Sequence, residues 1–199
     1  MTVNVDYYFT PVSPWTYLGH ARFAKLLGDT GATVSVHPVD YGAIFPISGG
    51  LPLPKRAPQR QAYRLVELKR FSSWLGIPLN VQPAHFPVSA DLASRLIVAV
   101  DLAHSSMAAL DLAGRLGAAV WAEQRNVADA ATLGAVLAEA GLPTDLLAQA
   151  DSPQVAARYA AGTQQAIDAG VFGAPSYVID GEIFWGQDRL DFVERRLRG

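Results

Sequence analysis

The sequence predicts an α/β fold in which a β-α-β unit at the start of the chain and a β-β-α unit at its end enclose a large all-helical insertion. Runs of β-branched and aromatic residues occur near the two ends of the chain, bounded by turn residues. Alanine and leucine dominate the middle half, where strand signals are nearly absent. The predicted division is therefore residues 1–41 with 170–199 for the α/β part, and residues 42–169 for the insertion.

The first unit consists of a strand, a helix and a second strand. Residues 2–9 are rich in β-branched and aromatic side chains, which predicts a strand. Apolar residues recur at steps of three and four over residues 14–27, which places them on one face of a helix. A turn over residues 28–31 leads into a second strand at 33–39. A helical crossover of this kind favours parallel strands.

The predicted insertion begins with a segment unlike the rest. Residues 42–58 contain four prolines and the pair Gly49-Gly50, so we expect a long functional loop there and no regular element. The helices expected after this loop cover residues 59–75, 90–104, 105–124, 129–140 and 152–169.

The last unit is a hairpin followed by a helix. Residues 176–179 and 182–185 have strand composition, and Asp180-Gly181 between them is a two-residue hairpin signal. Asp188 is expected to cap a final helix over residues 189–197. The complete order of elements is that of a thioredoxin fold with a helical insertion between its halves.

Composition excludes several classes of function. The 199 residues are 50% hydrophobic and 17% charged, which is typical of a globular protein, and a formal net charge of −2 gives no global attraction for nucleic acid or an anionic membrane. No signal-peptide pattern and no apolar run of about 20 residues occur, so we expect a cytoplasmic protein. The absence of cysteine excludes a thiol-disulfide oxidoreductase, and the four histidines lack spaced metal-ligand partners, so no metal site is predicted.

Ser13 is the first candidate for chemistry. It stands between the first strand and a helix that begins with Pro14 and Trp15, so we expect it at the helix N-cap. The free N–H groups and partial positive charge at that helix end stabilise an anion, whether a carboxylate, a phosphate or a thiolate. An ordinary capping serine without any catalytic role is the alternative.

Four segments also carry a resemblance to a known family. They are Tyr8-Phe9 with Ser13–Gly19, Arg60–Tyr63, Gly170–Pro175 and Phe184–Leu190. In this order they cover essentially the whole chain and resemble the DsbA-like thioredoxin superfamily, most of all the 2-hydroxychromene-2-carboxylate isomerases, which are bacterial relatives of kappa-class glutathione transferases. Ser13-Pro14-Trp15-Thr16 stands where the oxidoreductase relatives carry Cys-x-x-Cys.

The resemblance implies glutathione as cofactor. The Ser13 hydroxyl would be the catalytic group that donates a hydrogen bond to the glutathione thiolate, and that bond lowers a thiol pKa. A cis peptide before Pro175 would leave the Ala174 backbone free for the cysteinyl part, and Gln187 with Asp188 would hold the γ-glutamyl end. The implied cofactor-binding residues are Ser13, Pro14, Trp15, Arg60, Ala174, Pro175, Trp185, Gln187 and Asp188.

The resemblance also implies residues for a substrate. Arg60 and Tyr63 lie one helical turn apart, and the Arg60 fork suits a carboxylate of glutathione or of the substrate. A solvated arginine on the helix surface is the default expectation for Arg60, and Lys55 is a weaker candidate for the same role. Four aromatic residues could also form a wall against a flat bicyclic substrate, although core packing is the default expectation for each: Trp15, Phe45, Phe86 and Trp121.

Two positions depart from the family pattern. Gly50 stands where relatives commonly have an asparagine that helps to hold glutathione, and Thr10-Pro11 replaces an acidic-aromatic pair. These departures affect the expected affinity for glutathione and the choice of substrate. They leave the role of Ser13 unchanged.

The implied function is glutathione-dependent isomerisation of 2-hydroxychromene-2-carboxylate to trans-o-hydroxybenzylidenepyruvate in bacterial, naphthalene-type aromatic catabolism. The reaction would proceed by reversible addition of the glutathione thiolate, stabilised by Ser13, to the unsaturated substrate. The resemblance further implies a homodimer with a small aromatic carboxylate as partner molecule, and no nucleic acid or membrane. The alternatives are a kappa-like glutathione transferase or peroxidase, and a non-catalytic binding protein of the thioredoxin fold.

Overall fold

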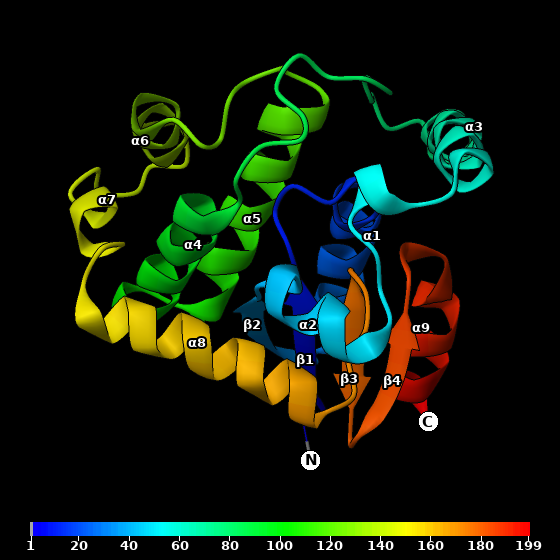
Figure 1. The fold of residues 1–199 in the computed structure, drawn as a ribbon. Helices are drawn as coiled ribbons and strands as arrows, with labels where there is room; N and C mark the ends of the chain where they lie inside the picture. Colours follow the sequence, from blue (N-terminus) through cyan, green and yellow to red (C-terminus); the bar gives the residue numbers. More distant parts are fainter. Residues whose placement is uncertain (1) are drawn as a thin grey trace.

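A four-stranded sheet lies at the centre of the computed structural model, which describes residues 2–199. The strands are β1 (Asn4–Phe9), β2 (Thr33–Pro38), β3 (Ser176–Ile179) and β4 (Glu182–Trp185), in the order β2-β1-β3-β4. β1 pairs in parallel with β2 and antiparallel with β3, which pairs antiparallel with β4. This arrangement confirms the predicted thioredoxin fold (Figure 1). Residue 1, with which the predicted division of the chain starts, lies outside the described residues.

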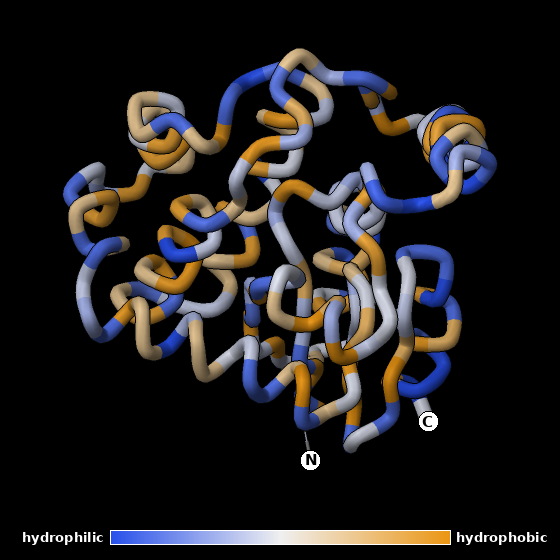
Figure 2. The backbone as a smooth tube through the Cα atoms, in the orientation of Figure 1, coloured by the Kyte–Doolittle hydropathy of each residue, from blue (hydrophilic) through white to orange (hydrophobic). Residues whose placement is uncertain are grey.

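Helices cover both faces of the sheet because side chains alternate along β1. Tyr7 and Phe9 point into the larger core with α1 (Pro14–Thr30) and α9 (Leu190–Arg198). Tyr8 points to the opposite face, where a second apolar cluster contains residues of α2 (Tyr41–Ser48) and α8 (Pro153–Asp168). Figure 1 shows α2 and α8 on the near side of the sheet. Hydrophilic residues dominate α9 in Figure 2.

The remaining helices belong to the predicted insertion. They are α3 (Pro58–Leu75), α4 (Asp91–Ala103), α5 (Ser106–Trp121), α6 (Ala130–Glu139) and α7 (Leu146–Gln149). α4 and α5 pack against each other and bury most of their apolar side chains, including the fully buried Trp121. α3 fully buries only Leu68 and lies at the periphery of the molecule (Figure 1). Most side chains of α3 are therefore in contact with solvent.

The expectation of a loop without regular structure over residues 42–58 was wrong. α2 spans Tyr41–Ser48, with Asp40 at its N-cap accepting from the Gly42 N–H at 2.7 Å, and a short 3₁₀ helix, η1, spans Leu53–Lys55. Pro46 lies inside α2, but burial of Tyr41 and Ile44 in the second cluster outweighs the hydrogen bond that the proline removes. The short helix α7 was also not predicted.

The prediction that Asp188 caps the last helix was wrong as well. A 3₁₀ turn, η2 (Gln187–Arg189), precedes α9, and the structure gives neither element a side-chain cap. The Asp188 carboxylate instead accepts from Arg189 at 3.0 Å. The earlier start of the helical turn therefore moves Asp188 from the cap into the first turn.

His20 makes folding sensitive to pH. It packs from α1 against Gly114 of α5, where an added Cβ would lie 2.5 Å from the imidazole ring, and burial lowers the pKa of His20 to about 4. Below about pH 6.5 the unfolded chain binds a proton at His20 that the folded chain refuses until about pH 4. The free energy of unfolding should therefore fall, by on the order of 3 kcal/mol, as pH decreases through this window.

Urea unfolding at a series of pH values measures this effect. The variant His20→Gln should show a flatter pH profile than the parent protein. His85→Gln, in an exposed loop, is the matched control and should retain the parent slope. Equal slopes for His20→Gln and the parent protein would contradict the assignment.

Candidate active site

Ser13 lies at the N-cap of α1, as predicted. It follows β1 in an extended conformation (φ −77°, ψ 127°), and its Oγ accepts from the Thr16 N–H at 3.3 Å. The Ser13 N–H donates to the Thr10 carbonyl at 3.0 Å, which closes the turn between strand and helix. Pro14 occupies the first helical position, where its missing N–H removes no bond. Ser13 is 9% exposed, so only a small part of the residue is in contact with solvent.

The Ser13 hydroxyl keeps its donor function. The cap uses a lone pair of Oγ, and within residues 2–199 the hydroxyl proton is given to no protein acceptor. The first turn of α1 contains no acidic residue, so no side chain there neutralises the positive helix end. Ser13 can therefore donate to an external anion while it continues to cap the helix.

The segment before β3 is fixed by hydrogen bonds from two directions. The Gly173 carbonyl accepts from the Tyr41 hydroxyl of α2 at 2.9 Å and from the Ser176 hydroxyl at 2.7 Å. The peptide between Ala174 and Pro175 is cis, as the resemblance implies, and Pro175 is buried whereas Ala174 is half-buried. The Pro175 carbonyl accepts from the Gly186 N–H at 2.9 Å, which ties this segment to the end of β4.

Trp185 and Gln187 lie at the end of the hairpin in different environments. Trp185 is 50% exposed and packs edge-on against Phe172 at a centroid distance of 4.8 Å. Gln187 is buried, and Arg22 of α1 donates both to its backbone carbonyl, at 2.7 Å, and to its side-chain Oε1. Its amide oxygen is thus committed to holding η2 against α1. Asp188 is exposed beside it, paired with Arg189.

Arg60, Tyr63 and Lys55 lie on the surface. All three are exposed, Arg60 and Tyr63 on α3 and Lys55 at the end of η1, and the structure gives none of them an ion-pair partner within residues 2–199. A Cβ added at Gly50 would lie 2.3 Å from the Phe45 ring, so a larger residue at this position would require that ring to move.

The predicted aromatic wall is not assembled from its four members. Trp15 packs edge-on against Phe71, Phe45 packs against Tyr41, and Phe86 packs against Trp121 at 4.8 Å. Trp121 is fully buried and belongs to the core, as expected by default for these aromatic residues, so it is not available to a substrate wall. Phe86 is half-buried over it and remains available at the surface.

Arg64 was not predicted as a site residue. It is half-buried, whereas the other basic residues of α3 are exposed. Its guanidinium lies over the Phe86 and Trp121 rings, with centroid distances of 5.3 and 5.6 Å. The sequence carries a signal for it, because Asp40 and Glu67 enclose a stretch without any acidic residue. The basic residues of that stretch are Lys55, Arg56, Arg60 and Arg64.

Across residues 2–199, no three histidine or acidic side chains gather as metal ligands would. None of the helices in the same residues is both long enough and apolar enough to cross a membrane.

Comparisons with known proteins agree with this architecture. The sequence pattern of the family described as "DSBA-like thioredoxin domain" matches residues 4–198. A 2-hydroxychromene-2-carboxylate isomerase of Pseudomonas putida is 30% identical over 197 residues, which cover 97% of this chain and 93% of that protein. A solved structure of 2-hydroxychromene-2-carboxylate isomerase has a TM-score of 0.82 at 28% identity and covers 98% of this chain and 94% of its own.

A shorter match concerns a transferase. Glutathione S-transferase kappa 1 of Caenorhabditis elegans is 33% identical over 81 residues, which cover 40% of this chain and 35% of that protein.

A mixed sheet with helices on both faces and a capping serine after its first strand defines a thioredoxin-fold protein without the usual cysteines. The chain belongs to the DSBA-like thioredoxin domain family, among relatives named as 2-hydroxychromene-2-carboxylate isomerases. The family predicted from the sequence is confirmed, and the names of its full-length relatives support an isomerase.

Proposed function

We propose that the protein is a glutathione-dependent isomerase that converts 2-hydroxychromene-2-carboxylate to trans-o-hydroxybenzylidenepyruvate. The observation that carries the proposal is the position of Ser13, whose unused donor lies at an acid-free helix N-terminus in a chain that contains no cysteine. A site that stabilises an anion but lacks its own thiol fits a thiolate brought by a cofactor. Similarity to named isomerases over the full chain supports the substrate.

We propose a role toward glutathione for Ser13 and for residues of the segments on either side of the hairpin. The Ser13 hydroxyl would donate to the sulfur, the Ala174 backbone would pair with the cysteinyl part, and the exposed Asp188 carboxylate would receive the γ-glutamyl ammonium. The further contacts in this proposal are Pro14, Trp15, Arg60, Trp185 and Gln187. Because the Gln187 amide oxygen is held by Arg22, its part would be to position Asp188 rather than to accept from the cofactor.

The chain's own contribution to the reaction is electrostatic. When bound, glutathione supplies a thiolate that adds reversibly to the unsaturated substrate and so permits rotation about the former double bond. Ser13 and the start of α1 favour the charged sulfur and thereby lower the thiol pKa. Arg60, Tyr63, Lys55 and Phe86 are the surface residues proposed to receive the substrate.

The biological setting is part of the proposal. We place the protein in the cytoplasm, as a homodimer, in naphthalene-type aromatic catabolism of a bacterium. The division of the chain into a thioredoxin-like part, residues 1–41 with 170–199, and a helical part, residues 42–169, stays a prediction that limited proteolysis can test.

Two measurements test the proposed function. Purified protein is mixed with 2-hydroxychromene-2-carboxylate, with glutathione, without it, or with S-methylglutathione, and ring opening is followed by absorbance. We expect acceleration with glutathione alone, because the methylated sulfur cannot form a thiolate. If glutathione does not accelerate ring opening, the proposed isomerase function is refuted.

The second measurement separates the alternatives. Millimolar glutathione should raise the midpoint of thermal unfolding, since a ligand that binds only the folded chain stabilises it. No shift would favour a non-catalytic binding protein. A shift combined with activity on a chloronitrobenzene or a hydroperoxide, but not on the chromene, would favour a kappa-like transferase or peroxidase, as the 81-residue match to the kappa enzyme suggests.

A further inference from the structure

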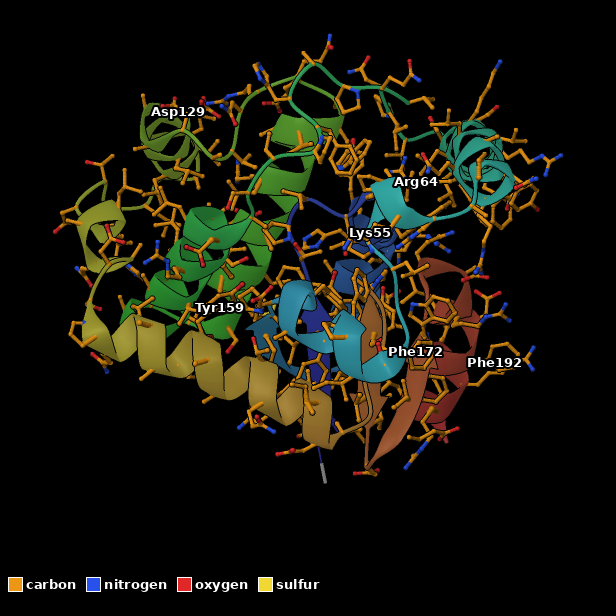
Figure 3. The ribbon with its side chains drawn as sticks, in the orientation of Figure 1. Lys55, Arg64, Asp129, Tyr159, Phe172 and Phe192 are labelled. Carbon is orange, nitrogen blue, oxygen red and sulfur yellow. The ribbon has the colours of Figure 1, made fainter. Side chains whose placement is uncertain are left out.

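An uncompensated group of cations lies where η1 meets α3. Lys55, Arg56, Arg60 and Arg64 occur in a stretch without acidic residues, and the structure pairs none of them with a carboxylate in residues 2–199. Glu67, which follows them on α3, is taken by Arg70 at 2.6 Å. The local positive charge is therefore not neutralised by the protein. Figure 3 labels Lys55 and Arg64.

Arg64 differs from the other three because it is drawn inward. Its guanidinium carbon lies 5.3 Å from the centroid of Phe86 and 5.6 Å from that of Trp121, a distance at which a cation is attracted to aromatic faces. Its Nη2 is buried and has no hydrogen-bond partner within residues 2–199. A buried donor without an acceptor destabilises the folded chain by roughly 1–3 kcal/mol.

The charge of Arg64 persists despite this environment. Burial, with a further contribution from nearby Arg56, lowers the pKa of Arg64 to about 10, so the guanidinium is still a cation at neutral pH. The two arginines repel each other, and no carboxylate relieves the repulsion. Folding therefore holds a cation in an unfavourable place, which is the arrangement that an incoming anion would relieve.

The location of Arg64 connects it to the Ser13 turn. The Trp121 indole N–H donates to the Val12 carbonyl at 3.3 Å, and Val12 immediately precedes Ser13. The ring on which the Arg64 guanidinium rests is thus the ring that holds the backbone before Ser13. An anion on Arg64 would lie near the start of α1, on the side from which Phe86 remains half-exposed.

We propose that Arg64 forms the carboxylate-binding site of this protein, receiving the carboxylate of a planar aromatic acid on a guanidinium that lies over the Phe86 and Trp121 rings. An arginine fork matches a carboxylate with two parallel hydrogen bonds, and the aromatic support fixes its orientation. This inference rests on the proposed function for the identity of the acid. It transfers the main carboxylate contact from Arg60, which is exposed, to Arg64.

Equilibrium binding of a stable analogue tests the site without any turnover. Chromone-2-carboxylate and its uncharged partner chromone-2-carboxamide are titrated calorimetrically into the parent protein and into Arg64→Gln, Arg64→Lys and Arg70→Gln. The parent should bind the carboxylate at least about tenfold more tightly than the amide. In Arg64→Gln this preference should disappear, because the affinity for the carboxylate falls while the affinity for the amide stays the same. Arg64→Lys should retain part of it, because the charge remains but the fork is lost.

Arg70→Gln is the matched control, since it removes the same charge from an exposed position on the same helix and should bind like the parent. Unchanged carboxylate affinity in Arg64→Gln, or an equal loss for acid and amide, would overturn the proposal. Thermal unfolding of Arg64→Gln should show an unchanged or raised midpoint, because an unpaired buried donor has been removed. A marked fall of that midpoint would make Arg64 a structural residue and also overturn the proposal.

A final comparison decides which carboxylate is bound. Glutathione and γ-glutamylcysteine, which lacks the glycine carboxylate, are titrated into the parent and Arg64→Gln. We expect the substitution to leave both affinities unchanged. Selective weakening of glutathione would assign Arg64 to the cofactor and refute an aromatic acid. Failure of the isomerase assay with these binding results intact would refute the proposed reaction and leave the carboxylate site standing.

Discussion

Replacing Ser13 by alanine is expected to lower glutathione-dependent turnover by about 10²- to 10³-fold, which is the usual loss when one donor to a developing or bound anion is removed. The same substitution should lower the free energy of unfolding by only about 1 kcal/mol, because the structural part of the hydroxyl is one N-cap bond to Thr16. The large effect on rate arises from the donor that the cap leaves unused. Steady-state kinetics and urea unfolding measure the two effects separately.

Ser152 provides the matched control for this substitution. It caps α8, is followed by Pro153, and accepts from the Val155 N–H at the same 3.3 Å that separates Ser13 from Thr16. Ser152→Ala should therefore reproduce the stability loss of Ser13→Ala and retain full activity. If both variants lost activity equally, or if Ser13→Ala remained active, Ser13 would be an ordinary helix cap.

The variant Trp121→Ala is expected to lower the free energy of unfolding by about 3–5 kcal/mol, the range for a large aromatic side chain removed from a core. Trp121 is fully buried at the end of α5, supports Phe86 and donates to Val12. The substitution would leave a cavity in the helical core and would also remove the hydrogen bond to the turn before Ser13. Urea unfolding measures the loss.

Two controls separate these contributions. Trp121→Phe keeps most of the packing and removes the bond to Val12, so it should cost about 1 kcal/mol. Trp74→Ala removes the same residue type from a position on α3 that is 74% exposed and should change stability by no more than about 0.5 kcal/mol. Trp121→Ala with the stability of the parent protein would contradict the account of this core.

The elements that the sequence predicts well are those with strong local signals. The strands Ser176–Ile179 and Glu182–Trp185 were predicted with the observed boundaries, because Asp180-Gly181 fixes the hairpin between them. α2 was missed because its proline and flanking glycines are loop signals, whereas its stability comes from burial of Tyr41 and Ile44 against distant residues. Tertiary packing of that kind leaves no local trace.

The residues of the candidate site also divide into those that local sequence predicts and those that depend on contacts between distant segments. The N-cap position of Ser13 follows from a strand end and a proline beside it, so local sequence predicts it. The cofactor role of Gln187 stays a prediction, whereas the bond to its amide oxygen from Arg22, which lies 165 residues away along the chain, could not be predicted from local sequence. Arg64 was overlooked because its burial depends on Phe86 and Trp121, contributed by other segments.

The pKa of the thiol of bound glutathione tests the central claim most directly, and ultraviolet absorbance of the thiolate during a pH titration of the complex measures it. A cysteine thiol ordinarily has a pKa near about 8.5. In the parent protein we predict a pKa below that value, so that the bound thiol is largely ionised at neutral pH, and in Ser13→Ala a pKa at least about one unit higher than in the parent. An unshifted thiol in the parent protein, or the same pKa in both proteins, would contradict the claim that Ser13 stabilises an external thiolate.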